Sequence, residues 1–263
     1  MDNTFIYKLV AEQPPKNTWV DPLIKRFMRF FNKKNNHLQL SYKINYLNDY
    51  YREQLGLNKK NMFIGNMISI EQAINIYHLL NQVILMKVPG EIVELGCYEG
   101  FTAILLQMIL DQNQCNKQIH VYDSFQGLPK VEAIDGNFFT EGMLATTEDQ
   151  LRENFLKYEV KLPHIHAGFF KDTLLAALPE KIAFAHLDGD LYSSIKESLH
   201  AIYPRLSMNA VVVIDDYYDP PIHPVNNILP GVKAACDEFF QDKPEKITVL
   251  IAGCESHGYF RKF

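Results

Sequence analysis

The stretch Ile182-Ala183-Phe184-Ala185-His186-Leu187-Asp188-Gly189-Asp190-Leu191-Tyr192 joins an apolar run to two acidic residues. The apolar run is typical of a strand buried on both faces, and the acids follow at its carboxyl end. Gly189 lets the backbone turn between them. In extended backbone, residues i and i+2 point to the same side, so Asp188 and Asp190 are predicted to face one small volume.

A second acidic pair follows the next apolar run of the chain. Ala210–Ile214 is the run, and Asp215 and Asp216 come directly after it. If the two runs are neighbouring strands, four carboxylates meet at one edge of the sheet. Such a group repels itself unless a cation or a proton intervenes. The sequence therefore predicts an acidic functional site at this edge.

Strand-like and helix-like segments alternate from Ser69 onward, where Ser69-x-x-Gln72 resembles a helix capping box. The predicted strands are Glu91–Cys97, Gln118–Phe125, His164–Phe169, Ile182–Leu187 and Ala210–Ile214. The predicted helices follow Ser69, cover about 101–110, 147–158, 172–178 and 231–240, and include one that carries Ile195, Leu199, Ile202 and Leu206. Lys246–Ala252 and Gly258–Phe263 are predicted to form a terminal hairpin. This alternation predicts an α/β fold with a doubly wound, mostly parallel sheet.

Composition limits the classes of function. The chain has 263 residues, 47% of them hydrophobic and 22% charged, as expected for a soluble globular protein. The net charge of -5 shows no basic excess, so no nucleic-acid partner is expected. No apolar run is long enough to span a bilayer and no signal-peptide pattern is present, which predicts a cytoplasmic protein. The four cysteines form no CxxC pair.

The beginning of the chain differs from the rest. Residues 1–68 are predicted to form a helical or irregular extension that caps the molecule or contacts a second copy, and residues 69–263 the main domain. Lys25–Lys34 is basic, aromatic and amphipathic. Two interpretations stay open for it: a helix that packs on the core or on a twin subunit, and a segment that contacts an acidic membrane surface or ligand.

A glycine-containing turn follows the first predicted strand, in the stretch Val93–Gly100. Gly96 would let a ligand approach the backbone, and the next helix offers free N–H donors. The spacing is ExGxxxG rather than GxGxxG, which argues against a pyrophosphate site. Asp123 ends the second predicted strand, where an acid typically binds ribose hydroxyls. Together they predict a nucleoside ligand, although Gly96 can also serve packing and Asp123 a turn.

At this point the chain resembles the macrocin O-methyltransferase family of class I S-adenosylmethionine-dependent methyltransferases. The matching stretches are Val93–Gly100, Asp123–Pro129, Gly168–Leu174, Leu187–Tyr192, Tyr203–Ser207 and Ile214–Tyr217. The resemblance implies a Rossmann-like, doubly wound, seven-stranded sheet with an antiparallel C-terminal hairpin. It also implies a cofactor site made of Glu94, Gly96, Tyr98, Thr102, Asp123, Ser124, Gly168 and Phe169.

The resemblance also gives the acids separate roles. Asp188, Asp215 and Asp216 match carboxylates that bind a divalent cation, usually Mg²⁺, and Asp190 matches the general base. Three carboxylate ligands leave positions for two substrate oxygens on an octahedral ion, which favours a vicinal diol acceptor. Asp190 as a helix cap and Asp216 as a turn residue stay open as alternatives. Alternative bases are His166, His186, His223 and His257.

The sequence thus predicts a Mg²⁺-dependent O-methyltransferase that acts on a sugar hydroxyl of a glycosylated natural product, a nucleotide sugar or a polysaccharide precursor. A homo-oligomer is expected. A phenolic acceptor of the catechol type is the alternative on the same fold. A nicotinamide-dependent oxidoreductase, which the missing GxGxxG disfavours, and a catalytically silent binding protein are alternatives of other classes.

Overall fold

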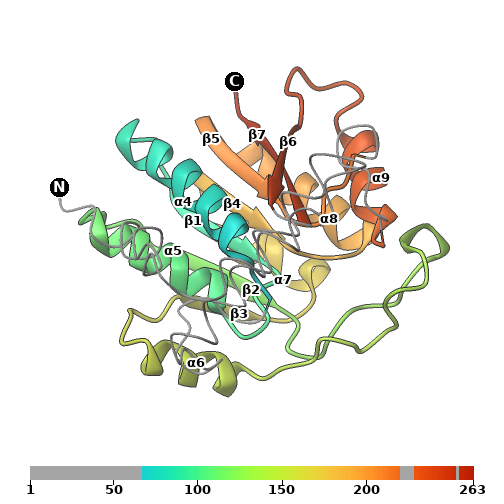
Figure 1. The fold of residues 1–263 in the computed structure, drawn as a ribbon, viewed down its shortest axis with the longest axis horizontal. Helices are drawn as coiled ribbons and strands as arrows, with labels where there is room; N and C mark the ends of the chain where they lie inside the picture. The colour runs from blue at the N-terminus through green and yellow to red at the C-terminus, as the bar shows by residue number, and fades with distance from the viewer. Residues whose placement is uncertain (1–66, 220–227, 253–254) are drawn as a thin grey trace, which may run out of the picture.

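The computed structural model describes residues 67–219, 228–252 and 255–263. They contain a seven-stranded sheet with the strand order β3-β2-β1-β4-β5-β7-β6 (Figure 1). The strands are β1 Glu91–Leu95, β2 Ile119–Asp123, β3 His164–Ala167, β4 Ile182–Leu187, β5 Leu206–Ile214, β6 Thr248–Ala252 and β7 Glu255–Arg261. Strands β1 to β5 pair in parallel, β7 is antiparallel to β5, and β6 is antiparallel to β7. The predicted sheet and terminal hairpin are confirmed.

Helices cover both faces of this sheet. They are α4 Ile70–Leu85, α5 Phe101–Gln112, α6 Glu148–Lys157, α7 Phe170–Ala177, α8 Tyr192–Ile202 and α9 Pro230–Phe239, with short 3₁₀ turns at Ala133–Asp135 and Tyr203–Arg205. Helices α4 and α5 contact each other in one layer, and α8 contacts both α7 and α9 in the other (Figure 1). None of the helices in the described ranges is long and apolar enough to cross a membrane. Lys25–Lys34 and almost all of the predicted extension lie outside these ranges.

The strand order determines where a ligand site is expected. The chain runs outward from β1 through β2 to β3 and then returns to β4, on the other side of β1. Ligands bind at such a reversal point, beyond the carboxyl ends of the strands. Leu95 pairs with Leu187, and Leu187 pairs with Ile214. Three strand ends therefore stop at the same level, and Asp188 and Asp215 follow directly.

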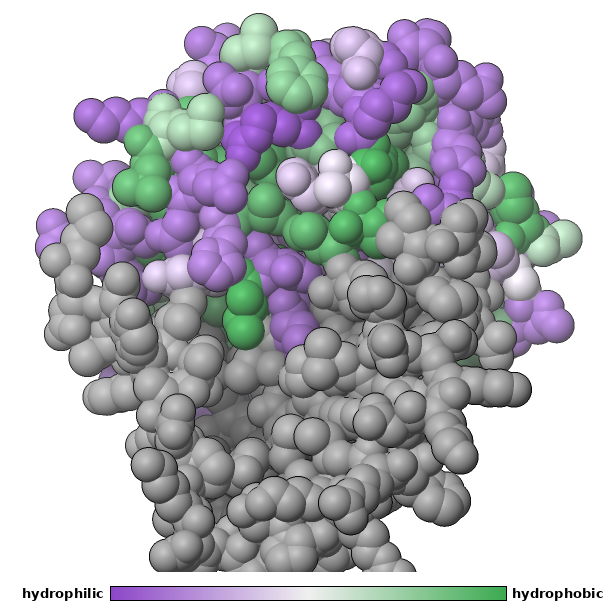
Figure 2. Space-filling model, turned by 45° about the horizontal axis from the view of Figure 1, so that its top comes forward, coloured by the Kyte–Doolittle hydropathy of each residue, from purple (hydrophilic) through white to green (hydrophobic). Residues whose placement is uncertain are grey.

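The centre of the sheet is apolar. All six residues of β4 are buried, as are Ala210–Ile214 of β5. Continuous apolar runs suit parallel strands that helices cover on both faces. On the face shown in Figure 2, by contrast, hydrophobic residues lie in small groups among hydrophilic ones.

Most predicted boundaries shift by a few residues, and the boundary between α8 and β5 shifts for a clear physical reason. Leu206 was expected on the helix that carries Ile195, but α8 ends at Ile202 and Leu206 begins β5. Pro204 lies in the 3₁₀ turn between them. Proline lacks an N–H and clashes with the preceding helical turn, so the helix cannot continue through it. Periodic apolar spacing alone did not show this stop.

Candidate active site

Three acids lie together at the ends of β4 and β5. They are Asp188, Asp190 and Asp216, and each has a carboxylate oxygen within 4.8 Å of an oxygen of the other two. All three residues are partly exposed. Backbone bonds fix the strand ends: the Asp188 N–H donates to Leu95 O at 2.8 Å, and the Asp215 N–H donates to Leu187 O at 2.8 Å. The structure thus places both acidic pairs at one edge of the sheet.

The backbone around these acids adopts a rare conformation. Asp190 has φ of +59°, Asp216 +54°, and Tyr98, beyond the end of β1, +46°. Residues other than glycine seldom occupy this left-handed region, although Asp tolerates it better than most. Such backbone strain clusters at functional sites. Here it marks the turns after three adjacent strands.

The acids also perturb one another. Burial and then the charge of Asp215 raise the pKa of Asp188 well above its ordinary value. Burial, followed by the charges of Asp215 and Asp123, raises the pKa of Asp190 to about 7. Carboxylates crowded in this way hold a proton or a cation near neutral pH.

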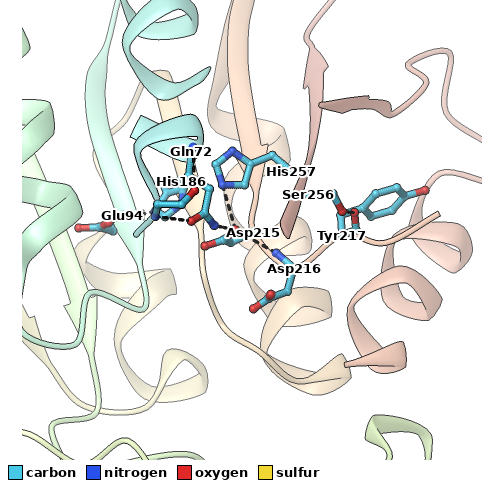
Figure 3. A network of polar contacts seen from close by, with 9 residues as sticks. Gln72, Glu94, His186, Asp215, Asp216, Tyr217, Ser256 and His257 are labelled. Carbon is cyan, nitrogen blue, oxygen red and sulfur yellow. Dashed lines mark hydrogen bonds and ion pairs between the residues drawn. The ribbon is translucent and has the colours of Figure 1, made fainter. Parts of the chain in front are cut away.

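Asp215 has a separate set of contacts (Figure 3). Its Oδ1 accepts hydrogen bonds from Gln72 Nε2 at 2.9 Å and from the Asp216 N–H at 3.0 Å. His257 Nε2 lies 2.9 Å from the same oxygen. Burial opposes the charge of Asp215, but His257 and then His186 outweigh it and lower its pKa to about 2.

The predicted cation ligands are therefore divided between two groups of side chains. Asp188 and Asp216 lie with Asp190, which was predicted as the base. Asp215 lies with His186 and His257, whose ligand atoms are also within 4.8 Å of one another and of a carboxylate oxygen of Asp215. The ligand and base roles themselves stay predictions.

Glu94 and His186 form a buried pair across β1 and β4. His186 Nδ1 lies 3.0 Å from Glu94 Oε1, and each side chain is only 1% exposed. Burial raises the pKa of Glu94. Burial opposes the charge of His186, but the hydrogen bond and the charge of Glu94 outweigh it and raise its pKa. Glu94, which was predicted to contact the cofactor, thus forms a hydrogen bond with His186 below the surface.

Gly96 has the packing role that the sequence left open as an alternative to a ligand contact. We expected a ligand to approach its backbone, but a Cβ there would lie 1.8 Å from the backbone oxygen of Asp188. Its φ of +86° also lies in the left-handed region. Gly96 therefore lets the turn after β1 pack against the end of β4, whether or not a ligand is bound.

Asp123 connects β2 to this turn. Its Oδ2 accepts hydrogen bonds from the N–H groups of Cys97 at 3.0 Å and Tyr98 at 2.9 Å, and its Oδ1 accepts one from Phe125 at 2.8 Å. The turn role that we considered for Asp123 is present. A carboxylate has about four acceptor sites, so the predicted contact with a ribose remains compatible with these bonds.

The other predicted cofactor residues lie at the same edge of the sheet. Ser124 donates to Gly127 O at 2.7 Å and accepts from the Gln126 N–H at 3.0 Å, so its hydroxyl shapes its own turn. Thr102 lies in the first turn of α5, and Gly168 and Phe169 lie between β3 and α7. The acids and the predicted cofactor residues therefore share one side of the molecule.

With this geometry known, the comparisons with known proteins are decisive. A family model described as macrocin O-methyltransferase matches residues 1–251. The chain belongs to the macrocin O-methyltransferase family. It is accordingly an S-adenosylmethionine-dependent O-methyltransferase, which sets aside the oxidoreductase and the silent binding protein.

Two curated members are similar to this methyltransferase in sequence. Demethyldecarbamoylnovobiocin O-methyltransferase of Streptomyces niveus is 34% identical over 197 residues, which cover 70% of this chain and 71% of that protein. Mycinamicin III 3''-O-methyltransferase of Micromonospora griseorubida is 31% identical over 166 residues, which cover 59% and 65%.

Solved structures agree on the fold of the methyltransferase. The O-methyltransferase NovP superposes with a TM-score of 0.63 at 29% identity, covering 86% of this chain and 98% of NovP. The calicheamicin methyltransferase CalS11 gives a TM-score of 0.61 at 20% identity, covering 97% and 95%. The class I methyltransferase fold is confirmed.

The structure also shows a residue of the methyltransferase that the sequence did not single out. Asp135 is 2% exposed, and its Oδ1 accepts a hydrogen bond from the Tyr192 N–H at 2.6 Å, at the start of α8. We had considered Asp190 for this capping role. Asp135 fills it instead, which leaves the Asp190 carboxylate with Asp188 and Asp216. No local pattern links Asp135 to Tyr192, because 57 residues separate them.

Proposed function

We propose that this methyltransferase transfers a methyl group to a sugar hydroxyl with the help of Mg²⁺. The acceptor would be a glycosylated natural product, a nucleotide sugar or a polysaccharide precursor. The observation that supports this most is the grouping of Asp188, Asp190 and Asp216, with Asp215 beside them. The names of the curated relatives, which include a methyltransferase of a dimethoxyrhamnosyl tetracenomycin, support the sugar acceptor.

The residues present fit a hard divalent cation. Mg²⁺ prefers oxygen ligands, and four carboxylates at two strand ends supply them. Burial and then the charge of Asp215 raise the pKa of Asp188, and a bound cation would offset both effects. Asp188 and Asp216, which lie together, would hold the ion with Asp215, which would reach it from the neighbouring group that contains His186 and His257. When bound, it would lower the pKa of the acceptor hydroxyl and orient it.

Asp190 is proposed to take the proton of the acceptor hydroxyl. The hydroxyl oxygen forms a bond to the methyl carbon while the bond from that carbon to sulfur breaks, and the proton passes to the Asp190 carboxylate. A general base works best when its pKa is near the operating pH. Without a cation, burial and then the charges of Asp215 and Asp123 raise the pKa of Asp190 to about 7. A cation on Asp188 and Asp216 would lower the pKa of Asp190, but it would also lower the pKa of the acceptor hydroxyl, which keeps the proton transfer favourable.

The remaining groups are proposed to position the methyl donor. S-Adenosylmethionine would supply the methyl group as a sulfonium from a site on the turn after β1 and the end of β2. Asp123 already holds the N–H groups of Cys97 and Tyr98, so it fixes the shape of that turn. Holding donor and acceptor in line supplies a large part of catalysis in such a displacement.

The acceptor class is tested by supplying sugars and catechols side by side. Purified protein with S-adenosylmethionine and Mg²⁺ is offered a panel of rhamnosylated natural products, nucleotide sugars and catechols. Methylated product is measured by mass spectrometry. We expect turnover on members of the sugar panel and little on catechols. Turnover on catechols alone would contradict the proposal and favour the phenolic alternative.

We also propose a cytoplasmic homo-oligomer. The described cysteines Cys97, Cys115 and Cys236 are free thiols, which fits a reducing compartment. Leu85 and Met208 are 68% and 64% exposed, and we propose them as candidates for a contact between subunits. Light scattering on the full chain measures the mass directly, and a mass of one subunit of 30.4 kDa would contradict the oligomer.

A further inference from the structure

Gln72 connects the first described helix to the acidic site. It lies in the first turn of α4, is 4% exposed, and is 143 residues from Asp215 in the sequence. The side-chain oxygen of Gln72 accepts a hydrogen bond from the Ser69 N–H at 2.7 Å, and the backbone N–H of Gln72 donates to Ser69 Oγ at 3.1 Å. This is the predicted capping box. The other end of the same amide donates to Asp215.

The orientation of this amide has one consistent solution. The Ser69 N–H can only donate, so it requires the Gln72 oxygen. An ionised carboxylate can only accept, so Asp215 requires the Gln72 nitrogen. Both requirements are met by the same side-chain orientation.

The contacts of Asp215 are concentrated on one oxygen. Gln72, the Asp216 N–H and His257 all meet Oδ1 (Figure 3). They leave Oδ2 as the oxygen for a ligand. In protein metal sites, hydrogen bonds to the far atom of a ligating carboxylate fix its direction and strengthen binding.

We propose that Gln72 is a positioning residue that holds Asp215 for the divalent cation and thereby couples cation binding to the start of α4. The inference rests on the cation site of the proposed function. Coupling is reciprocal: a cation on Asp215 stabilises the α4 cap by the same factor by which the intact cap favours the cation.

The first test measures cation affinity rather than turnover. Mn²⁺ binding to the full chain is followed by electron paramagnetic resonance, with Mg²⁺ as competitor. Gln72→Met keeps the length of the side chain and removes the amide. We expect Mn²⁺ affinity to fall about tenfold or more, as when hydrogen-bond partners of metal ligands are lost.

Two control variants separate positioning from stability. Ser69→Ala removes the cap oxygen of α4 but leaves the Gln72 amide on Asp215. Thr147→Ala removes the equivalent cap of α6, where Thr147 accepts from the Gln150 N–H at 3.1 Å. We expect Thr147→Ala to change Mn²⁺ affinity by less than about threefold. Ser69→Ala should weaken it measurably through the coupled cap, but by less than the tenfold loss in Gln72→Met, because the amide still contacts Asp215. Equal weakening in Ser69→Ala and Gln72→Met would overturn the direct role of the amide.

The second test needs no variant. Hydrogen exchange of the amides of Gln72 and Ala73, which the α4 cap holds, is measured with and without Mg²⁺. We expect slower exchange with Mg²⁺ and no such change in the first turn of α6. Unchanged exchange at α4 with Mg²⁺ bound would overturn the coupling. Failure of the wild-type protein to bind either cation would overturn the cation site itself, and the inference with it.

Discussion

Glu94 and His186 share a 3.0 Å hydrogen bond between adjacent strands, and neither side chain is more than 1% exposed. The pair sits below the carboxyl edge of β1 and β4, next to Asp215 and His257 (Figure 3). Burial of two ionisable groups is costly unless they satisfy each other. The layer directly below the acidic site therefore contains a buried polar pair, and each member of the pair needs the other for its stability.

Replacing His186 alone should destabilise the fold. His186→Leu leaves Glu94 buried without its partner, and we expect the free energy of unfolding in urea to fall by about 3–5 kcal/mol. The double variant Glu94→Leu/His186→Leu removes both polar groups and should recover most of this loss. If the double variant is no more stable than the single one, the pair does not act as a unit.

Gly96→Ala should reduce the free energy of unfolding far more than Gly142→Ala does, although both glycines have similar backbone angles. Gly96 and Gly142 have φ of +86° and +81°. A Cβ at Gly96 meets Asp188 O at 1.8 Å, whereas at Gly142 no atom of the described residues lies within 4 Å. In Gly142→Ala the free energy of unfolding should fall by only about 1–2 kcal/mol, the cost of a left-handed backbone for alanine.

Gly96→Ala should lose about 1–3 kcal/mol more, because the end of β4 must move. Urea unfolding of both variants measures the difference directly. Equal losses in the two variants would mean that the contact with Asp188 is not limiting.

Stability should fall in mild acid because of His120. Burial, followed by the charges of His164 and His166, lowers the pKa of His120 from 6.5 to about 4. Between these values the unfolded chain binds more protons than the folded one, so stability rises with pH and is lost as pH falls from about 6.5 to about 4.

His120→Gln should reduce the difference in melting temperature between about pH 4.5 and about pH 7, which lie near the two ends of that window. His78→Gln, at an exposed position of α4, is the control and should leave it unchanged. A melting profile of His120→Gln that parallels the wild type would show that other groups cause the acid sensitivity.

Asp190→Asn should reduce turnover by about 10²–10⁴, the usual contribution of a general base. Because Asp190 is not among the proposed ligands, Mn²⁺ binding should persist. Asp149→Asn, at an exposed position of α6, is the matched control. Loss of Mn²⁺ binding in Asp190→Asn would instead make Asp190 a ligand, as its closeness to Asp188 and Asp216 permits.

The sequence predicted most of what depends on local pattern. Apolar runs located the strands, and strand ends located Asp188 and Asp215, because a parallel sheet brings its carboxyl ends to one edge. The capping box at Ser69 and Gln72 was also correct, since its spacing is fixed by one helical turn.

Contacts between distant segments could not be predicted in this way. Gln72 reaches Asp215 from a helix on one face, and His257 reaches it from the last strand, through pairing that no spacing encodes. Asp135 replaced Asp190 as the cap of α8 for the same reason. For Gly96 the sequence left a ligand contact and packing open, and only the structure shows that the end of the neighbouring strand occupies its Cβ direction.

The central claim is that the acids after β4 and β5 hold a cation that methyl transfer needs. The most direct measurement is methyl transfer to a sugar acceptor from the panel after thorough EDTA treatment and again after addition of Mg²⁺. We expect activity to be lost with EDTA and restored by Mg²⁺ in the wild type but not in Asp188→Asn. Full activity after EDTA treatment, with no cation detected by elemental analysis, would contradict it.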